Sequence, residues 1–382
     1  MKHPFQLLLA NKQGSLLFAA VQNHILVYNT STGKIVGHWF DDQQSTHKNH
    51  QLERRTGKQI SSKVQIYNHV KCLALTESES HLVASTDSDK SVLIFTLDYD
   101  SENILTLSKR QPMAKRPYAI TTHDGEAIVA DKFGDAYTVP IDSNPPVLEK
   151  DLVPILGHVS MLTDVIVGVH NDKPFLITSD RDEHIRVSSY PKSYVIKSFL
   201  HGHEEFISQL CLVDDLLVSG GGDDYLFVWN WYTGEMLTKF DLKDIVRPFL
   251  TDAHLPPEKY RSEDSPREIS IAKIEFVQFG DAKYFVVLVE HTSCLIVLKY
   301  EEKELKLHNI IKLDSLCVAF TVGNDSVYVS LVSESILQRL TFPDGSPKNL
   351  IIDTNSIPID VNTKSEFAEL YPVATLRKRS EY

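Results

Sequence analysis

The sequence predicts an all-β protein, and within that class a seven-bladed β-propeller. Three observations support this prediction: short apolar runs rich in β-branched and aromatic residues, tight polar turns between those runs, and recurrence of this unit along the 382 residues. Helical periodicity is scarce. Closing radial sheets into a ring limits exposed sheet edges, so strands with weak individual signals can still form a stable fold.

The repeated unit consists of an apolar strand, a polar turn and a second apolar strand. Four of the six spacings between successive turns are 41–48 residues, close to the roughly 40–45 residues of one blade. The other two spacings contain insertions at residues 41–62 and 241–267. The seven turn positions are Gln22, Asp89, Gly134, Asp182, Asp223, Thr292 and Ser333. We therefore expect seven blades over residues 1–352 and a tail, residues 353–382, that folds back on the ring.

The two insertions differ in composition. After an acidic start, residues 41–62 carry the cations Lys48, Arg54, Arg55 and Lys58 and few apolar side chains, which predicts a loop. Residues 241–267 contain four prolines, and we expect one short helix near residues 242–250.

Composition and charge exclude several classes of protein. The formal net charge of −12 means that any RNA contact requires a local basic patch or a partner. The four cysteines lack metal-ligand spacing, so we expect reduced buried thiols, no metal site and an intracellular protein. The N-terminus does not resemble a signal peptide and no apolar stretch reaches 18 residues, so we expect no membrane contact. We expect a nuclear location, with the cytoplasm as a second one.

Dipeptides typical of WD repeats identify the kind of blade. The fifth unit contains Gly202-His203 and Trp229-Asn230, with asparagine in place of the usual final aspartate. In such blades His, Ser or Thr, Asp and Trp form a buried chain of hydrogen bonds, in which each polar group satisfies the next. The expected members are His203, Ser219, Asp223 and Trp229 in the fifth unit, and His158, Thr178 and Asp182 in the fourth. The prediction is therefore a WD40-type propeller.

The same residue types could also suggest a serine hydrolase. No GxSxG motif is present, and the Ser/Thr-His-Asp set occurs twice at blade spacing, which a catalytic site would not need. The run of three glycines at residues 220–222 lacks the lysine and the helix of a phosphate-binding loop. We therefore expect no catalytic residue and no cofactor.

Two charged segments are candidate interaction sites. Residues 179–186, Ser-Asp-Arg-Asp-Glu-His-Ile-Arg, form either a solvated turn with local ion pairs or a docking patch, in which arginine pairs with carboxylates. A basic strip contains Lys109, Arg110, Lys115 and Arg116, with Lys132 in the following turn. It forms an RNA contact, a nuclear-import signal or a solvated loop, and the sequence leaves these alternatives open.

Three longer strings resemble one known family. They are Ala-Asp-Lys-Phe-Gly-Asp at 130–135, Leu-Gly-His-Val-Ser-Met-Leu-Thr-Asp at 156–164, and Thr-Ser-Asp-Arg-Asp-Glu-His-Ile at 178–185. Together with Lys115-Arg116-Pro117 and the tail, they resemble the non-catalytic WD-repeat subunit of fungal tRNA (guanine-7-)-methyltransferase. The similar segments occur in order from Ser85 to the C-terminus.

The resemblance implies a heterodimer with a catalytic subunit that depends on S-adenosylmethionine and forms 7-methylguanosine in the tRNA variable loop. This chain would stabilise and activate that subunit, and tRNA would bind mainly to the partner. The implied docking residues are Asp180, Arg181, Glu183, Arg186 and Lys132. The candidates for RNA contact are Lys115, Arg116, Arg377, Lys378 and Arg379. The alternative is a general WD-repeat interaction platform such as a ubiquitin-ligase substrate receptor, because one fold hosts many functions.

Overall fold

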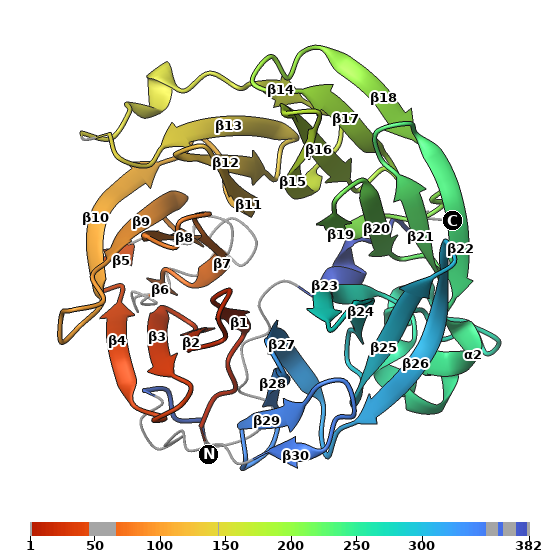
Figure 1. The fold of residues 1–382 in the computed structure, drawn as a ribbon. Helices are drawn as coiled ribbons and strands as arrows, with labels where there is room; N and C mark the ends of the chain where they lie inside the picture. Colours follow the sequence, from red (N-terminus) through yellow and green to blue (C-terminus); the bar gives the residue numbers. More distant parts are fainter. Residues whose placement is uncertain (1, 46–65, 144, 349–357, 362–371, 380–382) are drawn as a thin grey trace, which may run out of the picture.

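The computed structural model describes residues 2–45, 66–143, 145–348, 358–361 and 372–379. Seven four-stranded antiparallel sheets stand radially around a central axis, as Figure 1 shows. In each sheet the strands follow chain order from the centre of the ring to its outer edge. The prediction of a seven-bladed β-propeller is confirmed.

The strands of the first four blades have the following bounds. Blade 1 contains β1 (Leu7–Ala10), β2 (Leu16–Val21), β3 (His24–Asn29) and β4 (Ile35–Phe40). Blade 2 contains β7 (Val70–Leu75), β8 (His81–Thr86), β9 (Ser91–Leu97) and β10 (Leu105–Pro112). Blade 3 contains β11 (Pro117–His123), β12 (Glu126–Asp131), β13 (Asp135–Pro140) and β14 (Leu156–Gly157). Blade 4 contains β15 (Leu162–His170), β16 (Lys173–Asp180), β17 (Ile185–Ser189) and β18 (Ile196–Leu200).

The remaining three blades continue the same order. Blade 5 contains β19 (Ile207–Val213), β20 (Leu216–Gly221), β21 (Tyr225–Asn230) and β22 (Glu235–Asp241). Blade 6 contains β23 (Ile271–Phe279), β24 (Ala282–Val289), β25 (Cys294–Glu301) and β26 (Glu304–Lys312). Blade 7 contains β27 (Cys317–Gly323), β28 (Ser326–Leu331), β29 (Leu337–Thr341) and β30 (Pro347–Lys348).

All seven predicted turn positions lie between the second and third strands of their blades. The expected helix in the second insertion is also present, as α2 (Lys243–Val246) followed by the 3-10 helix η2 (Arg247–Phe249). The other 3-10 helices are η1 (Glu149–Asp151), η3 (Asp252–His254), η4 (Glu258–Tyr260) and η7 (Val373–Leu376). None of the helices in the described part of the chain is long and apolar enough to cross a membrane.

The core lies between the blades. The middle strands are buried on both faces, and all six residues of β2 and of β20 are buried. One apolar cluster joins Val218 and Val228 of blade 5 to Phe285 and Val287 of blade 6. Near-continuous apolar runs are therefore needed in these strands, because each side of a blade faces a neighbouring blade rather than water.

The ring closes between blade 7 and blade 1. The inner strands contact their neighbours around the whole ring, including β27 with β1. At the N-terminus, the backbone N–H of His3 donates to the carbonyl of Ile359 at 3.0 Å, and Lys2 pairs with Asp360. Phe5 and Leu8 pack in one apolar cluster with Tyr328. The N-terminal residues are thus joined to blade 7 and to the segment after it by a hydrogen bond, an ion pair and apolar packing.

The two faces of the ring differ in what they carry. Because the strands alternate in direction, the turns between second and third strands lie on the same face as the connections between blades. This face, called the connection face below, bears both insertions. The first insertion begins and ends in a two-stranded sheet of β5 (Gln44–Ser45) and β6 (Ile66–Tyr67). The cations expected at Lys48, Arg54, Arg55 and Lys58 lie outside the described residues.

Candidate partner interface

Blade 5 contains a chain of hydrogen bonds among four buried side chains. The Nδ1–H of His203 donates to the Asp223 carboxylate at 2.7 Å, and its Nε2 accepts from the Ser219 hydroxyl at 2.7 Å. The Ser219 oxygen accepts from the indole N–H of Trp229 at 2.9 Å. Each member satisfies the next, which makes their burial tolerable. Since Ser219 is fully buried inside the blade, it cannot act as a nucleophile on an external substrate.

In blade 4 the aspartate of this chain is Asp180, and the assignment of Asp182 is wrong. The Nδ1–H of His158 donates to Asp180 at 2.9 Å, and its Nε2 pairs with the Thr178 hydroxyl at 2.8 Å. The other oxygen of Asp180 accepts the backbone N–H groups of Asp182 and His184, which closes the turn. Asp182 was predicted because it follows Thr178 at the same spacing as Asp223 follows Ser219. The two turns are built differently, so the aspartate that bonds the histidine comes earlier in blade 4 than in blade 5.

Two of the predicted docking residues are not on the surface. Asp180 is 2% exposed, and Arg186 is 7% exposed. The Arg186 guanidinium group donates to the Ser188 hydroxyl and to the carbonyls of Gly157 and Ser193 at 2.9–3.0 Å. All three of its nitrogens are therefore used within the propeller, two of them by residues of blade 4 and one by Gly157 of β14 in blade 3. The expectation that Asp180 and Arg186 contact a partner directly is corrected on this ground. Asp180 instead stabilises the turn that carries Arg181, and Arg186 joins blade 4 to β14 of blade 3.

The turn at residues 181–184, called the docking turn below, is in contact with the C-terminal tail. The Nε–H of Arg181 donates to the carbonyl of Leu376 at 2.6 Å. The ammonium group of Lys378 lies 2.9 Å from the Asp182 carboxylate and 3.7 Å from that of Glu183. Arg181, Glu183 and Lys378 are thus brought together on the connection face. Lys378, which was predicted to contact RNA, is here paired with carboxylates of the docking turn.

Residues 372–379, called the C-terminal clasp below, are fixed to blades 5 and 6. The backbone N–H groups of Val373 and Ala374 donate to the Glu290 carboxylate at 2.6 and 2.8 Å. Arg377 donates to the carbonyls of Gly222 and Ile269 and pairs with Glu205, and Arg379 forms a two-bond pair with Glu268. The expectation that Arg377 and Arg379 contact RNA is therefore corrected, because both cations are already paired within the chain. The rest of the tail from residue 353 is described only at residues 358–361.

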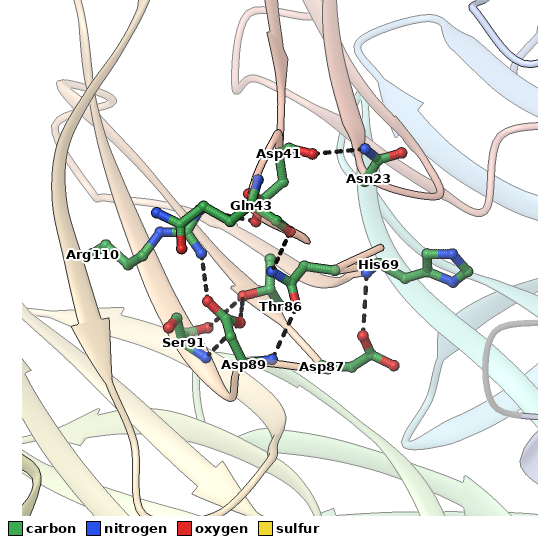
Figure 2. Close-up of polar contacts among 10 residues, drawn as sticks. Asn23, Asp41, Gln43, His69, Thr86, Asp87, Asp89, Ser91 and Arg110 are labelled. Carbon is green, nitrogen blue, oxygen red and sulfur yellow. Dashed lines mark hydrogen bonds and ion pairs between the residues drawn. The ribbon is translucent and has the colours of Figure 1, made fainter. Parts of the chain in front are cut away.

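The basic strip is smaller than its sequence suggests. Figure 2 shows Arg110 beside Asp89 and Asp41, and its terminal nitrogens lie 2.5 and 2.9 Å from these two carboxylates. The Lys109 ammonium group is buried and donates to backbone carbonyls, including that of Ser143 at 2.8 Å. Only Lys115 and Arg116 of the strip are exposed.

The Arg110 pairs belong to a network that holds the root of the first insertion. In Figure 2 the Asp89 carboxylate also accepts from the Thr86 hydroxyl, at 2.6 Å, and from the backbone of Ser91. The side chain of Asn68, just after β6, accepts from the Asp89 backbone and donates to the Gln43 carbonyl. Both ends of the insertion are therefore tied to blade 2.

Two exposed apolar residues near the docking turn were not found from the sequence. Phe133 is 66% exposed and Val159 is fully exposed. Their turns are in contact, since Gly134, at φ +99°, packs against the carbonyls of His158 and Ser160 with no room for a Cβ. The Lys115 ammonium group lies 4.4 Å from the centre of the Phe133 ring.

With the half-buried Lys132, these residues form a small apolar centre with a basic rim, called the Phe133 patch below (Lys115, Lys132, Phe133 and Val159). A phenylalanine at a turn apex, followed by glycine, is a signal that could have identified it, because such a position cannot reach the core. The described residues contain no group of His, Cys, Asp or Glu side chains suited to hold a metal ion.

Comparisons with known sequences identify relatives of this chain. The profile of a family described as "tRNA methyltransferase TRM82 WD40 domain" matches residues 17–153 and 143–339. Curated relatives named "tRNA (guanine-N(7)-)-methyltransferase non-catalytic subunit TRM82" are 40% identical in Meyerozyma guilliermondii and 38% in Debaryomyces hansenii, over the full length of both chains. The relative of that name in Saccharomyces cerevisiae is 35% identical, over all of this chain and 99% of its own length.

Solved structures show a similar fold at low sequence identity. The WD40 repeats of RRP9 superpose with a TM-score of 0.59 at 16% identity, covering 87% of this chain and 88% of that one. The β-propeller domain of Cps50 (Swd1) from Myceliophteria thermophila gives a TM-score of 0.63 at 10% identity, covering 89% and 96%. These similarities support the propeller architecture alone.

Proposed function

The chain belongs to the TRM82 family of tRNA (guanine-N(7)-)-methyltransferase non-catalytic subunits, and we propose that its connection face docks the catalytic subunit through blades 3 and 4. It is a non-catalytic subunit, as its relatives over the full length are named. The partner carries out the methyl transfer that forms 7-methylguanosine in the tRNA variable loop, and this chain stabilises and activates the partner within a heterodimer. The general interaction-platform alternative rests on the fold alone, which unrelated WD40 proteins share.

The single observation that supports the docking surface is the position of the Phe133 patch beside Arg181. The segment that follows Val159 contacts this turn, because the Met161 carbonyl accepts from the Arg181 backbone N–H at 3.0 Å and the Ser160 hydroxyl donates to Asp182 at 2.6 Å. Large exposed apolar side chains in the middle of a basic rim are typical of interface hot spots, where an aromatic anchor is buried and arginine pairs with carboxylates. Burying the Phe133 side chain contributes roughly 1.5–3 kcal/mol. We therefore expect the catalytic subunit to present an apolar surface bordered by acidic residues.

Direct contact with tRNA is a second element of the proposal, and it concerns Lys115 and Arg116. Both are exposed on the connection face, in the link between blades 2 and 3. The net charge of −12 opposes general attraction of RNA, so the partner supplies most of the affinity and these cations supplement it.

We also propose that the complex works in the nucleus, with the cytoplasm as a second location. The four cysteines are free thiols and three of them are buried, which suits the reducing conditions that both compartments share. Fluorescence microscopy of the tagged full chain in living cells tests the location, and exclusion from the nucleus would contradict it.

Co-purification tests the docking surface. We expect the double variant Phe133→Ser/Val159→Ser to fold but to lose the catalytic subunit when the two chains are co-expressed. The matched control is Tyr194→Ser, because Tyr194 is 72% exposed in blade 4 on the opposite face. Full co-purification by the double variant, or equal loss in the control, would show that the partner does not use this surface.

A further inference from the structure

The C-terminal clasp touches the docking turn with two different groups. The carbonyl of Leu376 accepts from the Nε–H of Arg181 at 2.6 Å, and Lys378 pairs with Asp182 and Glu183. The clasp is not needed to complete any blade, since each four-stranded sheet is formed by residues before 349. The contacts of the clasp therefore do not help to form the blades. They affect the surface of the propeller around Arg181.

The clasp itself is held firmly. Leu376 is 4% exposed, and the Arg377 side chain enters between blades 5 and 6 to reach the carbonyls of Gly222 and Ile269. Glu290 binds the start of the clasp and Glu268 binds its end, at Arg379. The Leu376 carbonyl is consequently a fixed acceptor for Arg181, anchored by residues of other blades.

Fixing the Nε–H has a consequence for the rest of the guanidinium group. Arginine carries five N–H donors in a rigid plane, so one fixed hydrogen bond restricts the orientation of the others. Among the described residues, no group bonds the two terminal nitrogens of Arg181. These nitrogens form the pair of parallel donors that binds a carboxylate through two hydrogen bonds.

Lys378 changes the charge next to that donor pair. Without it, Asp182 and Glu183 would place two carboxylates beside Arg181, which would repel an acidic partner and compete for the guanidinium group. With Lys378 in place, the formal charges of Arg181, Asp182, Glu183 and Lys378 sum to zero.

We propose that the C-terminal clasp is a positioning element of the docking site, which orients Arg181 and cancels the neighbouring acidic charge so that the face recognises a carboxylate of the catalytic subunit. This inference rests on the proposed function. Lost pre-organisation of one arginine and restored repulsion together are expected to weaken binding about tenfold.

A double-mutant cycle on the full complex tests the inference. The variants are a chain ending at Tyr371, Arg181→Ala, and the two combined, and calorimetric titration with the purified catalytic subunit gives each Kd. Truncation is expected to weaken binding about tenfold in the parent chain but only about threefold when Arg181 is already alanine, because repulsion by Asp182 and Glu183 is then the one remaining effect. Equal losses in both backgrounds, no loss, or tighter binding after truncation would overturn the proposal, the last by showing that the clasp covers the site.

A charge reversal keeps the test informative if the truncated chain fails to fold. Lys378→Glu is expected to weaken binding several-fold, with the thermal midpoint nearly unchanged. The matched control is Lys306→Glu, since Lys306 pairs with Glu301 and Glu302 and is 42% exposed, against 49% for Lys378. Equal Kd values for the two variants would refute the role of Lys378. If the parent chain itself does not bind the catalytic subunit, the proposed function is wrong. If the parent chain binds and the variants do not differ as expected, the role of the clasp is wrong.

Discussion

The His158 imidazole donates from Nδ1 to the Asp180 carboxylate at 2.9 Å, and both side chains are almost completely buried. Asp180 also accepts two backbone N–H groups of the turn that presents Arg181. The exposed docking turn is thus supported by a buried polar chain, which explains why a loop this rich in charge has a defined shape.

The first prediction separates the structural aspartate from its exposed neighbour. Asp180→Ala would leave the His158 imidazole and two backbone N–H groups without their acceptor, so we expect the free energy of unfolding to fall by about 3 kcal/mol. Asp182→Ala removes a partly exposed carboxylate and is expected to cost less than about 1 kcal/mol. Urea unfolding followed by circular dichroism compares the two. A larger loss of unfolding free energy for Asp182→Ala than for Asp180→Ala would show that Asp182 is the aspartate of the buried hydrogen-bond chain.

The second prediction concerns acid. Burial alone would raise the pKa of Asp180, but hydrogen bonds from His158 and the His184 backbone hold it below its ordinary value. The unfolded chain then binds this proton more readily, so the carboxylate stabilises the fold above its unfolded pKa, about 3.9, and this contribution is lost as pH falls through the lower folded pKa. Asp180→Asn should therefore show a smaller drop in unfolding free energy below about pH 4 than the parent chain. Identical pH profiles would exclude this role.

A third prediction tests the root of the first insertion. Arg110 pairs with Asp41, whose side chain is 0% exposed, and with Asp89. Arg110→Ala would leave a buried unpaired carboxylate, and we expect a loss of about 3–5 kcal/mol in unfolding free energy. Arg247→Ala removes an exposed pair with Asp244 and should change the value by less than about 0.5 kcal/mol. Similar small losses in both variants would mean that the network does not stabilise the fold.

The fourth prediction concerns tRNA. Arg116→Glu should leave complex formation intact but weaken tRNA binding by the complex about three- to fivefold, and reduce the slope of log Kd against log salt concentration by about 1. Fluorescence anisotropy with labelled tRNA measures both quantities. Lys192→Glu, an exposed cation on the opposite face, is the control. If both variants bind tRNA like the parent complex, this chain does not contact the RNA at Arg116.

Local patterns were sufficient to predict the architecture. Gln22, Asp89 and Ser333 were identified as turns because turn chemistry and strand periodicity depend on adjacent residues. The hydrogen-bonded chain of blade 5 could be anticipated for the same reason, whereas Asp180 could not be told from Asp182 without the backbone geometry of the turn.

Charged side chains were the main source of error. Arg110, Arg186 and Arg377 were expected at the surface because arginine is rarely buried without a partner. Their partners lie far away in the sequence or are backbone carbonyls, which a pattern of residue types does not reveal. Arg181 and Leu376 are 195 residues apart, so the contact that relates the tail to the docking turn depends on the closed ring.

The central claim is that this chain activates a methyltransferase by docking it and performs no chemistry itself. The most direct measurement is the initial rate of methyl transfer from S-adenosylmethionine to the guanine N7 of tRNA, with the catalytic subunit alone, this chain alone, and both together. We predict no transfer by this chain alone, a rate raised at least tenfold by the pair over the catalytic subunit, and loss of that increase with Phe133→Ser/Val159→Ser. An unchanged rate on adding this chain, or turnover by this chain alone, would contradict the account.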